Sequence, residues 1–248
     1  MSEIVGAVVV AAGSSRRMAG VDKLWLPLAG RPLLEHTLRA LTAIPELTRI
    51  ALVVSPEGQR RVDERRELPP WNALHAVVEG GAERADSVQA GLTALGLCDF
   101  VVIHDGARPL VTAALVQAGL AAARAHGAAI PALPVTDTIK QVDAAGRIVA
   151  TPDRAALRAV QTPQVFRHDL LVAAYAAAGA GRSASTDDAT LLERIGHPVA
   201  TYPGDPRNIK VSTPADVPIA ELYLSEVGSR KARGSRRLGY GQHVLPPR

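Results

Sequence analysis

The amino-acid sequence predicts a three-layer α/β/α sandwich with a Rossmann-like, mostly parallel central sheet and a protruding β-arm. Between residues 4 and 135, apolar runs of strand length alternate with segments of helical periodicity, which is typical of repeated strand–helix–strand units. The first run, residues 4–12, is rich in β-branched residues and shows no apolar–polar alternation, as expected of a strand covered on both faces. A chain of 248 residues accommodates one such large domain.

The elements of the sandwich are expected in a regular order. Pro32 lies near the first turn of the first helix, and Gly127 suits the C-cap of a later one. The expected strands are residues 4–12, 49–55, 73–79, 99–104 and 128–135, and the expected helices are 32–43, a polar helix after Pro56, 85–95 and 112–125. Right-handed crossovers then bring the loops after the first, third and fourth strands to the carboxyl edge of the sheet, where such sheets bind ligands.

The pattern changes after residue 135. Residues 136–151 are polar on both faces and contain a turn at residues 143–146, so we expect a β-hairpin that protrudes as an arm. The remaining expected elements are helices at 168–178, up to 195 and at 214–227, and strands at 197–202 and 208–211. No repeat or linker interrupts residues 1–227, so we expect one folded domain there, followed by a basic tail over residues 228–248.

The net charge gives no case for a nucleic-acid partner. The formal charge is +4, but residues 228–248 hold six basic and no acidic residues, which leaves 22 basic and 24 acidic residues in the rest of the chain. The tail is typical of a disordered, solvated extension, and the alternative interpretation is an anion-binding arm. Aromatic residues amount to only 3%, which disfavours a base-stacking surface.

Cysteine usage and hydropathy narrow the class further. Cys98 is the one cysteine, which excludes a disulfide framework and a multi-cysteine zinc site. No apolar stretch reaches the roughly 18 residues that a membrane span needs, so we expect no membrane association. The basic pair Arg16-Arg17 follows the first apolar run, which is the reverse of a signal peptide. We therefore expect a cytoplasmic protein.

The loop over residues 13–23 is the most informative segment for function. Its small residues let backbone N–H groups approach a phosphate closely, and Arg16, Arg17 and Lys23 add positive charge. The loop lacks the glycines of a Walker A motif and of a dinucleotide-binding fingerprint. This disfavours P-loop ATPases and dinucleotide dehydrogenases.

Two further loops are expected at the same edge of the sheet. Gly80 and Gly81 end a strand and Ser87 lies at the start of a helix, which suits recognition of a base or ribose, although an ordinary turn has the same composition. Asp105 ends another strand, where a carboxylate commonly holds a metal or a hydroxyl and where helix capping is the alternative. The histidines show no metal-ligand spacing, and Cys98 precedes a buried strand, so neither a zinc site nor a cysteine nucleophile is expected.

Taken together and in order, these motifs resemble those of the 2-C-methyl-D-erythritol 4-phosphate cytidylyltransferases. The motifs are AAGSSRRM with Lys23, GGAERADSV, HDGARP, DTIK, Asp153-Arg154 with QTPQVF, TDDA and NIKV, and the likeness extends from about Val5 to Tyr223. The resemblance implies a nucleotidyltransferase fold and transfer of CMP from CTP to 2-C-methyl-D-erythritol 4-phosphate in non-mevalonate isoprenoid biosynthesis. It also implies Mg²⁺ held mainly through the CTP phosphates, without assigned protein ligands, and a homodimer whose β-arms interlock.

The resemblance also assigns roles to single positions. It implies that Arg17 and Lys23 stabilise charge on the CTP α-phosphate, and that Arg154 and Lys210 position the acceptor phosphate. The implied CTP-binding residues are Ala11, Ala12, Gly13, Ser14, Gly81, Ala82, Ser87, Asp105 and Gly106, and the implied substrate-binding residues are Asp105, Arg108, Thr138, Arg154, Thr162, Thr186 and Lys210. Two positions depart from the family pattern, because Asp22 replaces a proline and Ala82 a commonly acidic residue.

The residue types fit this chemistry. Phosphoryl-type transfer depends on in-line positioning and neutralisation of negative charge, and a phosphate oxygen is already an anionic nucleophile that needs no general base. Two alternatives stay open. A cytidylyltransferase acting on ribitol 5-phosphate would differ only in its acceptor pocket. A non-catalytic nucleotide-binding regulator could discard Lys23 or Lys210, and this chain has both.

Overall fold

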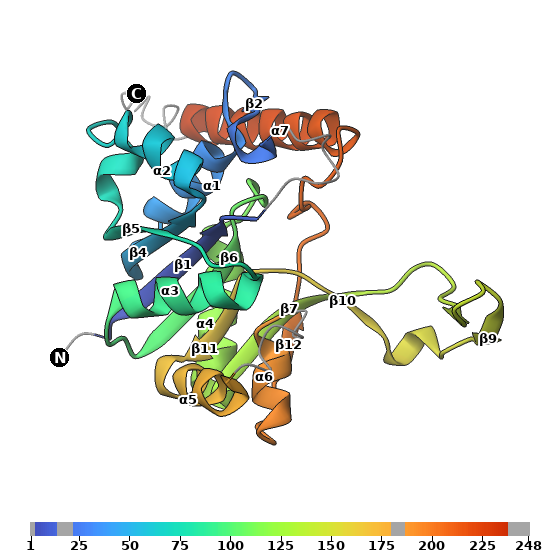
Figure 1. The fold of residues 1–248 in the computed structure, drawn as a ribbon. Helices are drawn as coiled ribbons and strands as arrows, with labels where there is room; N and C mark the ends of the chain where they lie inside the picture. The colour runs from blue at the N-terminus through green and yellow to red at the C-terminus, as the bar shows by residue number, and fades with distance from the viewer. Residues whose placement is uncertain (1–2, 14–21, 180–186, 238–248) are drawn as a thin grey trace, which may run out of the picture.

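A computed structural model describes residues 3–13, 22–179 and 187–237, with side chains up to residue 226. Its centre is an eight-stranded sheet in the order β10-β7-β11-β6-β1-β4-β5, with β12 also paired to β7 (Figure 1). The strands of this sheet are β1 (Val5–Ala11), β4 (Leu47–Val54), β5 (Ala76–Glu79), β6 (Phe100–Asp105), β7 (Ala128–Pro134), β10 (Arg158–Val160), β11 (Gln164–Arg167) and β12 (Ala200–Pro203). The helices are α1 (Leu33–Thr42), α2 (Pro56–Asp63), α3 (Arg84–Leu95), α4 (Ala113–His126), α5 (His168–Ala178), α6 (Ala189–Arg194) and α7 (Asp216–Arg237).

The sheet is parallel in the half that the N-terminal elements form. β1 lies between β4 and β6 and pairs with both in parallel, and β5 extends this half beyond β4. β11 lies antiparallel between β6 and β7, β10 pairs antiparallel with β7, and β12 pairs with β7 in parallel. The prediction of a mostly parallel sheet is confirmed, and the antiparallel β10 and β11 come from a returning segment in which we expected no strand.

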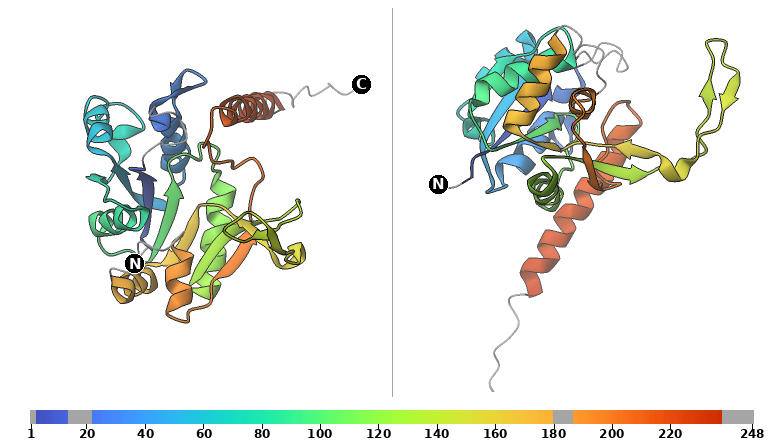
Figure 2. Two further views of the ribbon diagram at one scale, coloured as in Figure 1. Left: turned by 45° about the vertical axis from the view of Figure 1, so that its right-hand side comes forward. Right: turned by 90° about the horizontal axis from the view of Figure 1, so that it is seen from below.

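Helices cover both faces of the sheet and make the predicted sandwich (Figure 2). On one face, α1, α2 and α4 pack against a cluster that includes Val9 and Leu38. On the other face, α3, α5 and α6 pack against a cluster that includes Val8, Leu92 and Leu171. Because Val8 and Val9 belong to opposite clusters, β1 is covered on both sides, which explains its unbroken apolar run.

The predicted strand at residues 208–211 is wrong, because this segment is irregular in the structure. Asn208 is fully buried, and its side-chain amide donates to the Thr162 carbonyl at 2.7 Å. The backbone N–H of Val211 donates to the Ala107 carbonyl at 2.9 Å. The segment is therefore held across the loop after β6 by side-chain and single backbone bonds rather than along the edge of the sheet.

The segment after β7 extends away from the sandwich (Figure 1). Within it, β8 (Gln141–Val142) and β9 (Ile148–Ala150) form a short antiparallel hairpin. The side chains of Val142, Ile148 and Val149 are all exposed in the single chain. The hairpin is shorter than the predicted range 136–151, because only residues 141–142 and 148–150 have strand geometry.

The last helix is longer than expected. α7 continues to Arg237, past the predicted end at residue 227, so the first part of the expected tail continues the helix. Four arginines, one lysine and one alanine in residues 228–237 favour a helix, whereas Gly228 and Gly234 disfavour it. Residues 238–248 lie outside the described part of the chain. Within the described residues, no helix combines the length and the apolar character needed to cross a bilayer.

A buried polar network fastens the loop after β6 to the residues that precede β11. The Asp105 N–H donates to Thr162 Oγ1 at 3.0 Å, and this oxygen lies 3.1 Å from His104 Nδ1. His104 Nε2 lies 3.2 Å from the carbonyl of Arg108. Since a carbonyl can only accept, Nε2 carries the proton and the Thr162 hydroxyl donates to Nδ1. Burial lowers the pKa of His104 to about 4, so the imidazole is neutral at neutral pH.

This arrangement predicts a pH-dependent loss of stability. Below about pH 6.5 the unfolded chain binds a proton at residue 104 that the folded chain does not, so the free energy of unfolding falls until about pH 4. In His104→Gln this contribution is absent. Between pH 7 and pH 5, urea unfolding should show that the wild type loses about 2 kcal/mol more than His104→Gln. Equal losses in the two proteins would contradict the neutral, buried state of His104.

Candidate active site

A cavity of about 340 Å³ opens at the carboxyl ends of β1, β5 and β6. The residues around it come from the loops after these three strands, from the start of α3 and from the 3₁₀ helix η2 (Lys23–Trp25), with Lys210 from the irregular segment before α7. They are Val10, Ala11, Ala12, Gly13, Lys23, Leu24, Gly81, Ala82, Glu83, Arg84, Ser87, Asp105, Ala107 and Lys210. The cavity lies at the edge of the sheet where the sequence analysis expects ligands to bind.

Two glycines allow the loop after β5 to pack closely against the residue that follows β1 and against the first turn of α3. A Cβ on Gly80 would come within 2.2 Å of the Cβ of Ala12 and 2.6 Å of Ser87 Oγ. A Cβ on Gly81 would lie 2.3 Å from the Cβ of Asp86. A side chain at either place would clash, and Gly81 therefore brings backbone groups to the cavity wall. The N-terminus of α3, whose amides favour anions, follows immediately.

The charge at the centre of the site is the carboxylate of Asp105, which three cations surround. Lys210 Nζ lies 2.9 Å from Asp105 Oδ2, Arg108 Nε lies 3.6 Å from the same oxygen, and Arg84 Nε lies 3.9 Å from Oδ1. Burial alone would raise the pKa of Asp105, but the charges of Lys210, Arg84 and Arg108 outweigh it and lower the pKa to about 2. Asp105 is therefore ionised at every physiological pH.

Arg84 also bridges two parts of the fold. Its NH1 atom lies 2.8 Å from Oδ2 of Asp188, a side chain only 1% exposed at the start of α6. The other oxygen of Asp188 accepts a 2.6 Å hydrogen bond from the hydroxyl of Tyr175 on α5. One guanidinium therefore links α3, the end of β6 and the α5–α6 pair.

Lys23 lines the same cavity from the 3₁₀ helix η2. Its Nζ donates to the carbonyl of Val211 at 2.9 Å, one residue beyond Lys210. The preceding Asp22 caps η2 by accepting from the Leu24 N–H at 3.2 Å. Burial raises the pKa of Asp22, and the charges of Arg61 and Lys23 act in the opposite direction. The two lysines are thus held near one stretch of backbone.

Trp25 anchors the segment that carries Lys23. Its ring stacks on Trp71, with centroids 5.5 Å apart and an interplanar angle of 8°. The guanidinium groups of Arg61 and Arg65 lie 5.5 and 5.4 Å from the same ring. The stacking of the two rings and the two cation–π contacts together stabilise the position of η2.

The structure brings most of the sequence-predicted residues to this cavity. Those that line it are Ala11, Ala12, Gly13, Lys23, Gly81, Ala82, Ser87, Asp105 and Lys210. Arg108, Thr162 and Gly106 lie behind the wall rather than on it, where Arg108 NH1 donates to the Asn208 carbonyl at 2.7 Å. Ser14, Arg17 and Thr186 fall outside the described residues.

Arg154 and Thr138 do not line this cavity in the single chain. Both are exposed and belong to the segment that extends from the sandwich (Figure 1). Arg154 begins the 3₁₀ helix η4 (Arg154–Ala156), and its NH1 donates to the carbonyl of Thr136 at 2.8 Å. Neither residue is therefore part of the cavity wall that one chain provides.

The sequence analysis missed Arg84 and Glu83. Arg84 is the first residue of α3, where the helix dipole disfavours a positive charge. An arginine at the first position of a helix, three residues after a glycine pair, is a signal that it has an anionic partner. Asp188 could not be paired with it from sequence, because the two residues lie far apart in the chain.

The donor set at the cavity bears on metal binding. Among the residues described, no three histidine, cysteine or acidic side chains gather to form a metal cage. Asp105 Oδ2 already lies within 2.9 Å of Lys210. Asp105 at the end of β6 and Glu83 before α3 are therefore the acidic groups that the cavity lining offers to a divalent cation. Mg²⁺ is usually bound through one or two carboxylates together with phosphate oxygens of a substrate, and this donor set fits that mode of binding.

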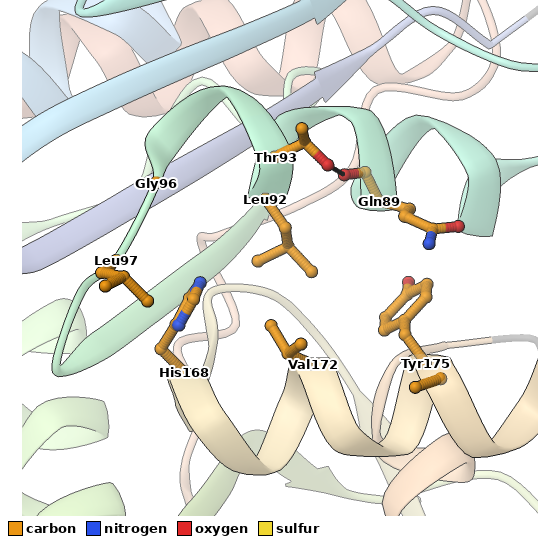
Figure 3. Close-up of a pocket in the computed structure, with 9 residues that line it drawn as sticks. Gln89, Leu92, Thr93, Gly96, Leu97, His168, Val172 and Tyr175 are labelled. Carbon is orange, nitrogen blue, oxygen red and sulfur yellow. Dashed lines mark hydrogen bonds between the residues drawn. The ribbon is translucent and has the colours of Figure 1, made fainter.

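A second cavity, of about 330 Å³, lies between α3 and α5 (Figure 3). Leu92, Leu97 and Val172 give it a largely apolar wall, and neither lysine nor arginine lines it. The cavity at the strand ends, which Lys23, Arg84 and Lys210 line, has positive charge for an anionic substrate, so it is the candidate active site.

Comparison with known proteins identifies the family of this chain. Residues 5–226 match the family model for 2-C-methyl-D-erythritol 4-phosphate cytidylyltransferase. Relatives with that name include a Dehalococcoides mccartyi protein, 44% identical over 91% of this chain and 98% of its own length, and a Nocardia farcinica protein, 46% identical over 89% and 94%.

Solved structures give the same result. A 4-diphosphocytidyl-2C-methyl-D-erythritol synthase from Anaerococcus prevotii is 30% identical, with a TM-score of 0.79 over 90% of this chain and 99% of the other. A 2-C-methyl-D-erythritol 4-phosphate cytidylyltransferase from Thermus thermophilus is 35% identical, with a TM-score of 0.71 over 89% and 98%. With a family match over most of its length, this chain belongs to the 2-C-methyl-D-erythritol 4-phosphate cytidylyltransferase family.

Proposed function

We propose that this chain transfers CMP from CTP to 2-C-methyl-D-erythritol 4-phosphate, which yields 4-diphosphocytidyl-2-C-methyl-D-erythritol and pyrophosphate. The observation that carries the proposal is the cavity in which Lys23, Arg84 and Lys210 meet the glycine-lined loop after β5. Membership of the family supports the same reaction. The product is an intermediate of non-mevalonate isoprenoid biosynthesis, and we propose that the reaction takes place in the cytoplasm.

In the proposed reaction, a phosphate oxygen of the acceptor attacks the α-phosphorus of CTP. The bond from the α-phosphorus to the bridging oxygen of pyrophosphate breaks, and pyrophosphate leaves with that electron pair. The nucleophile is already anionic, so no residue has to remove a proton. This agrees with the buried, neutral state of His104, the one histidine beside Asp105.

The protein then has to hold two anionic substrates, CTP and the acceptor phosphate, close together. Lys23 on one wall is proposed to stabilise the charge that develops on the α-phosphate, together with Arg17. Lys210, whose side chain is 41% exposed, is proposed to hold the acceptor phosphate. Ala11, Ala12, Gly13, Ser14, Gly81, Ala82, Ser87 and Gly106 are proposed to contact CTP. Backbone groups in a tight loop suit the edge of a pyrimidine and leave little room for a purine.

Mg²⁺ is proposed to enter with CTP. When bound, it would neutralise part of the triphosphate charge and favour pyrophosphate as the leaving group. Asp105 is the acidic residue at the end of β6 that could contribute an oxygen to it.

We further propose that the active enzyme is a homodimer with shared sites. Arg154 and Thr138 lie on the extended segment and are exposed, while Lys210 lines the cavity of the sandwich. The apolar side chains of Val142, Ile148 and Val149 are also exposed there, and a short hairpin with free edges gains by pairing with a second chain. In such a dimer, Arg154 and Thr138 of one chain would complete the acceptor site of the other, beside Arg108, Thr162 and Thr186.

A pyrophosphate-release assay tests the reaction directly. With CTP and Mg²⁺, turnover is expected with 2-C-methyl-D-erythritol 4-phosphate and not with ribitol 5-phosphate. CTP should be preferred over ATP and GTP, since the loop at Gly81 and Ser87 excludes purines. Lys210→Gln, purified in parallel, controls for contaminating enzymes and should lose about 10²-fold in kcat/KM. If turnover occurs only with ribitol 5-phosphate, that compound is the acceptor and the proposed acceptor is wrong. Equal use of GTP and CTP would contradict the assigned base preference.

Mixing two inactive variants tests the shared site. Arg154→Ala should lower kcat/KM for the alditol phosphate by about 10²-fold while the KM for CTP stays close to normal. Arg154→Ala mixed with Lys210→Ala, under conditions that allow subunit exchange, should recover part of the activity, because a heterodimer holds one site with both residues intact. Each variant taken alone through the same exchange conditions is the control. No recovery, with exchange verified by native mass spectrometry, would place both residues of a site on one chain.

A further inference from the structure

The cavity contains a charge arrangement that the proposed reaction must disturb. In the structure, Lys210 Nζ is the cation closest to Asp105, at 2.9 Å from Oδ2. If Lys210 turns to the acceptor phosphate, as the proposed function requires, this buried carboxylate loses that contact. A buried charge that loses a partner is strongly unfavourable, so another cation has to compensate.

Arg108 is held in its present position, with its Nε 3.6 Å from Asp105 Oδ2. Its guanidinium is nearly buried, and its NH1 atom is committed to the Asn208 carbonyl at 2.7 Å. Asn208 is itself fully buried and bonded to the Thr162 carbonyl, so the segment that holds Arg108 is fixed.

Arg84 is more exposed than Arg108 and lies farther from Asp105. Its side chain is 27% exposed, and its Nε lies 3.9 Å from Asp105 Oδ1. A shift of about 1 Å would bring this N–H to hydrogen-bond distance. The opposite end of the guanidinium stays near Asp188 Oδ2 at 2.8 Å, and Tyr175 fixes the other oxygen of Asp188.

We propose that Arg84, oriented by Asp188, is a positioning residue that balances Asp105 when Lys210 turns to the acceptor phosphate. This rests on the proposed function of Lys210. Arg84 then acts on the acceptor through Asp105 and Lys210. Without it, Asp105 holds Lys210 more tightly and the acceptor phosphate competes less well for the lysine.

The test separates this role from direct binding of CTP, because Arg84 lines the same cavity. In Arg84→Gln, the KM for 2-C-methyl-D-erythritol 4-phosphate should rise by about tenfold or more, and the KM for CTP should change less than about threefold. Arg84→Lys keeps the positive charge and should restore most of the acceptor KM. Asp188→Asn keeps the shape but releases the guanidinium, so it should also raise the acceptor KM selectively. This second variant carries the test if Arg84→Gln does not fold.

Arg167→Gln is the matched control, because it breaks an exposed ion pair with Asp169 on the surface. Both KM values should stay unchanged in it. A rise in the CTP KM equal to or larger than that for the acceptor would make Arg84 a nucleotide ligand and overturn the inference, as would unchanged KM values in Arg84→Gln and Asp188→Asn. Absence of turnover in the wild type would instead overturn the proposed function on which the inference rests.

Discussion

The ionised carboxylate of Asp105, buried at the carboxyl end of β6, is the constraint on which the site depends. A buried carboxylate must be balanced by nearby cations and hydrogen-bond donors. Here the cations come from three separate segments: Arg84 at the start of α3, Arg108 in the loop after β6, and Lys210 near the C-terminal helix. The three cations that balance this one carboxylate therefore hold segments that are distant in the sequence close together.

The same constraint gives the cavity its chemistry. Its lining carries the cations Lys23, Arg84 and Lys210 and the anions Glu83 and Asp105, which leaves an excess of positive charge for anionic substrates. Lys23 donates to the carbonyl of Val211, and Val211 directly follows Lys210 in the chain. The two proposed phosphate sites therefore lie next to the same short segment of backbone. A reaction between two phosphate groups needs this kind of proximity more than it needs acid–base groups.

Much of the fold could be predicted because it depends on local patterns. The buried strand β1, its parallel neighbours and the loops after β1, β5 and β6 follow from apolar runs, glycine pairs and crossover handedness. The contacts of Arg84 with Asp105 and Asp188 depend on tertiary geometry, and no local pattern encodes them. Residues 208–211 have the composition of a strand, but the buried side chain of Asn208 holds them in an irregular path.

The measurement that tests the account most directly is the stability of Asp105→Asn at pH 7. The substitution keeps the size of the side chain but removes the charge, so the nearly buried Arg108 loses its carboxylate partner. Urea unfolding should show a loss of about 3 kcal/mol or more in the free energy of unfolding. Asp169→Asn, which alters an exposed ion pair, should change it by less than about 0.5 kcal/mol. If Asp105→Asn is as stable as the wild type, the buried charge does not hold these segments together and the central claim is wrong.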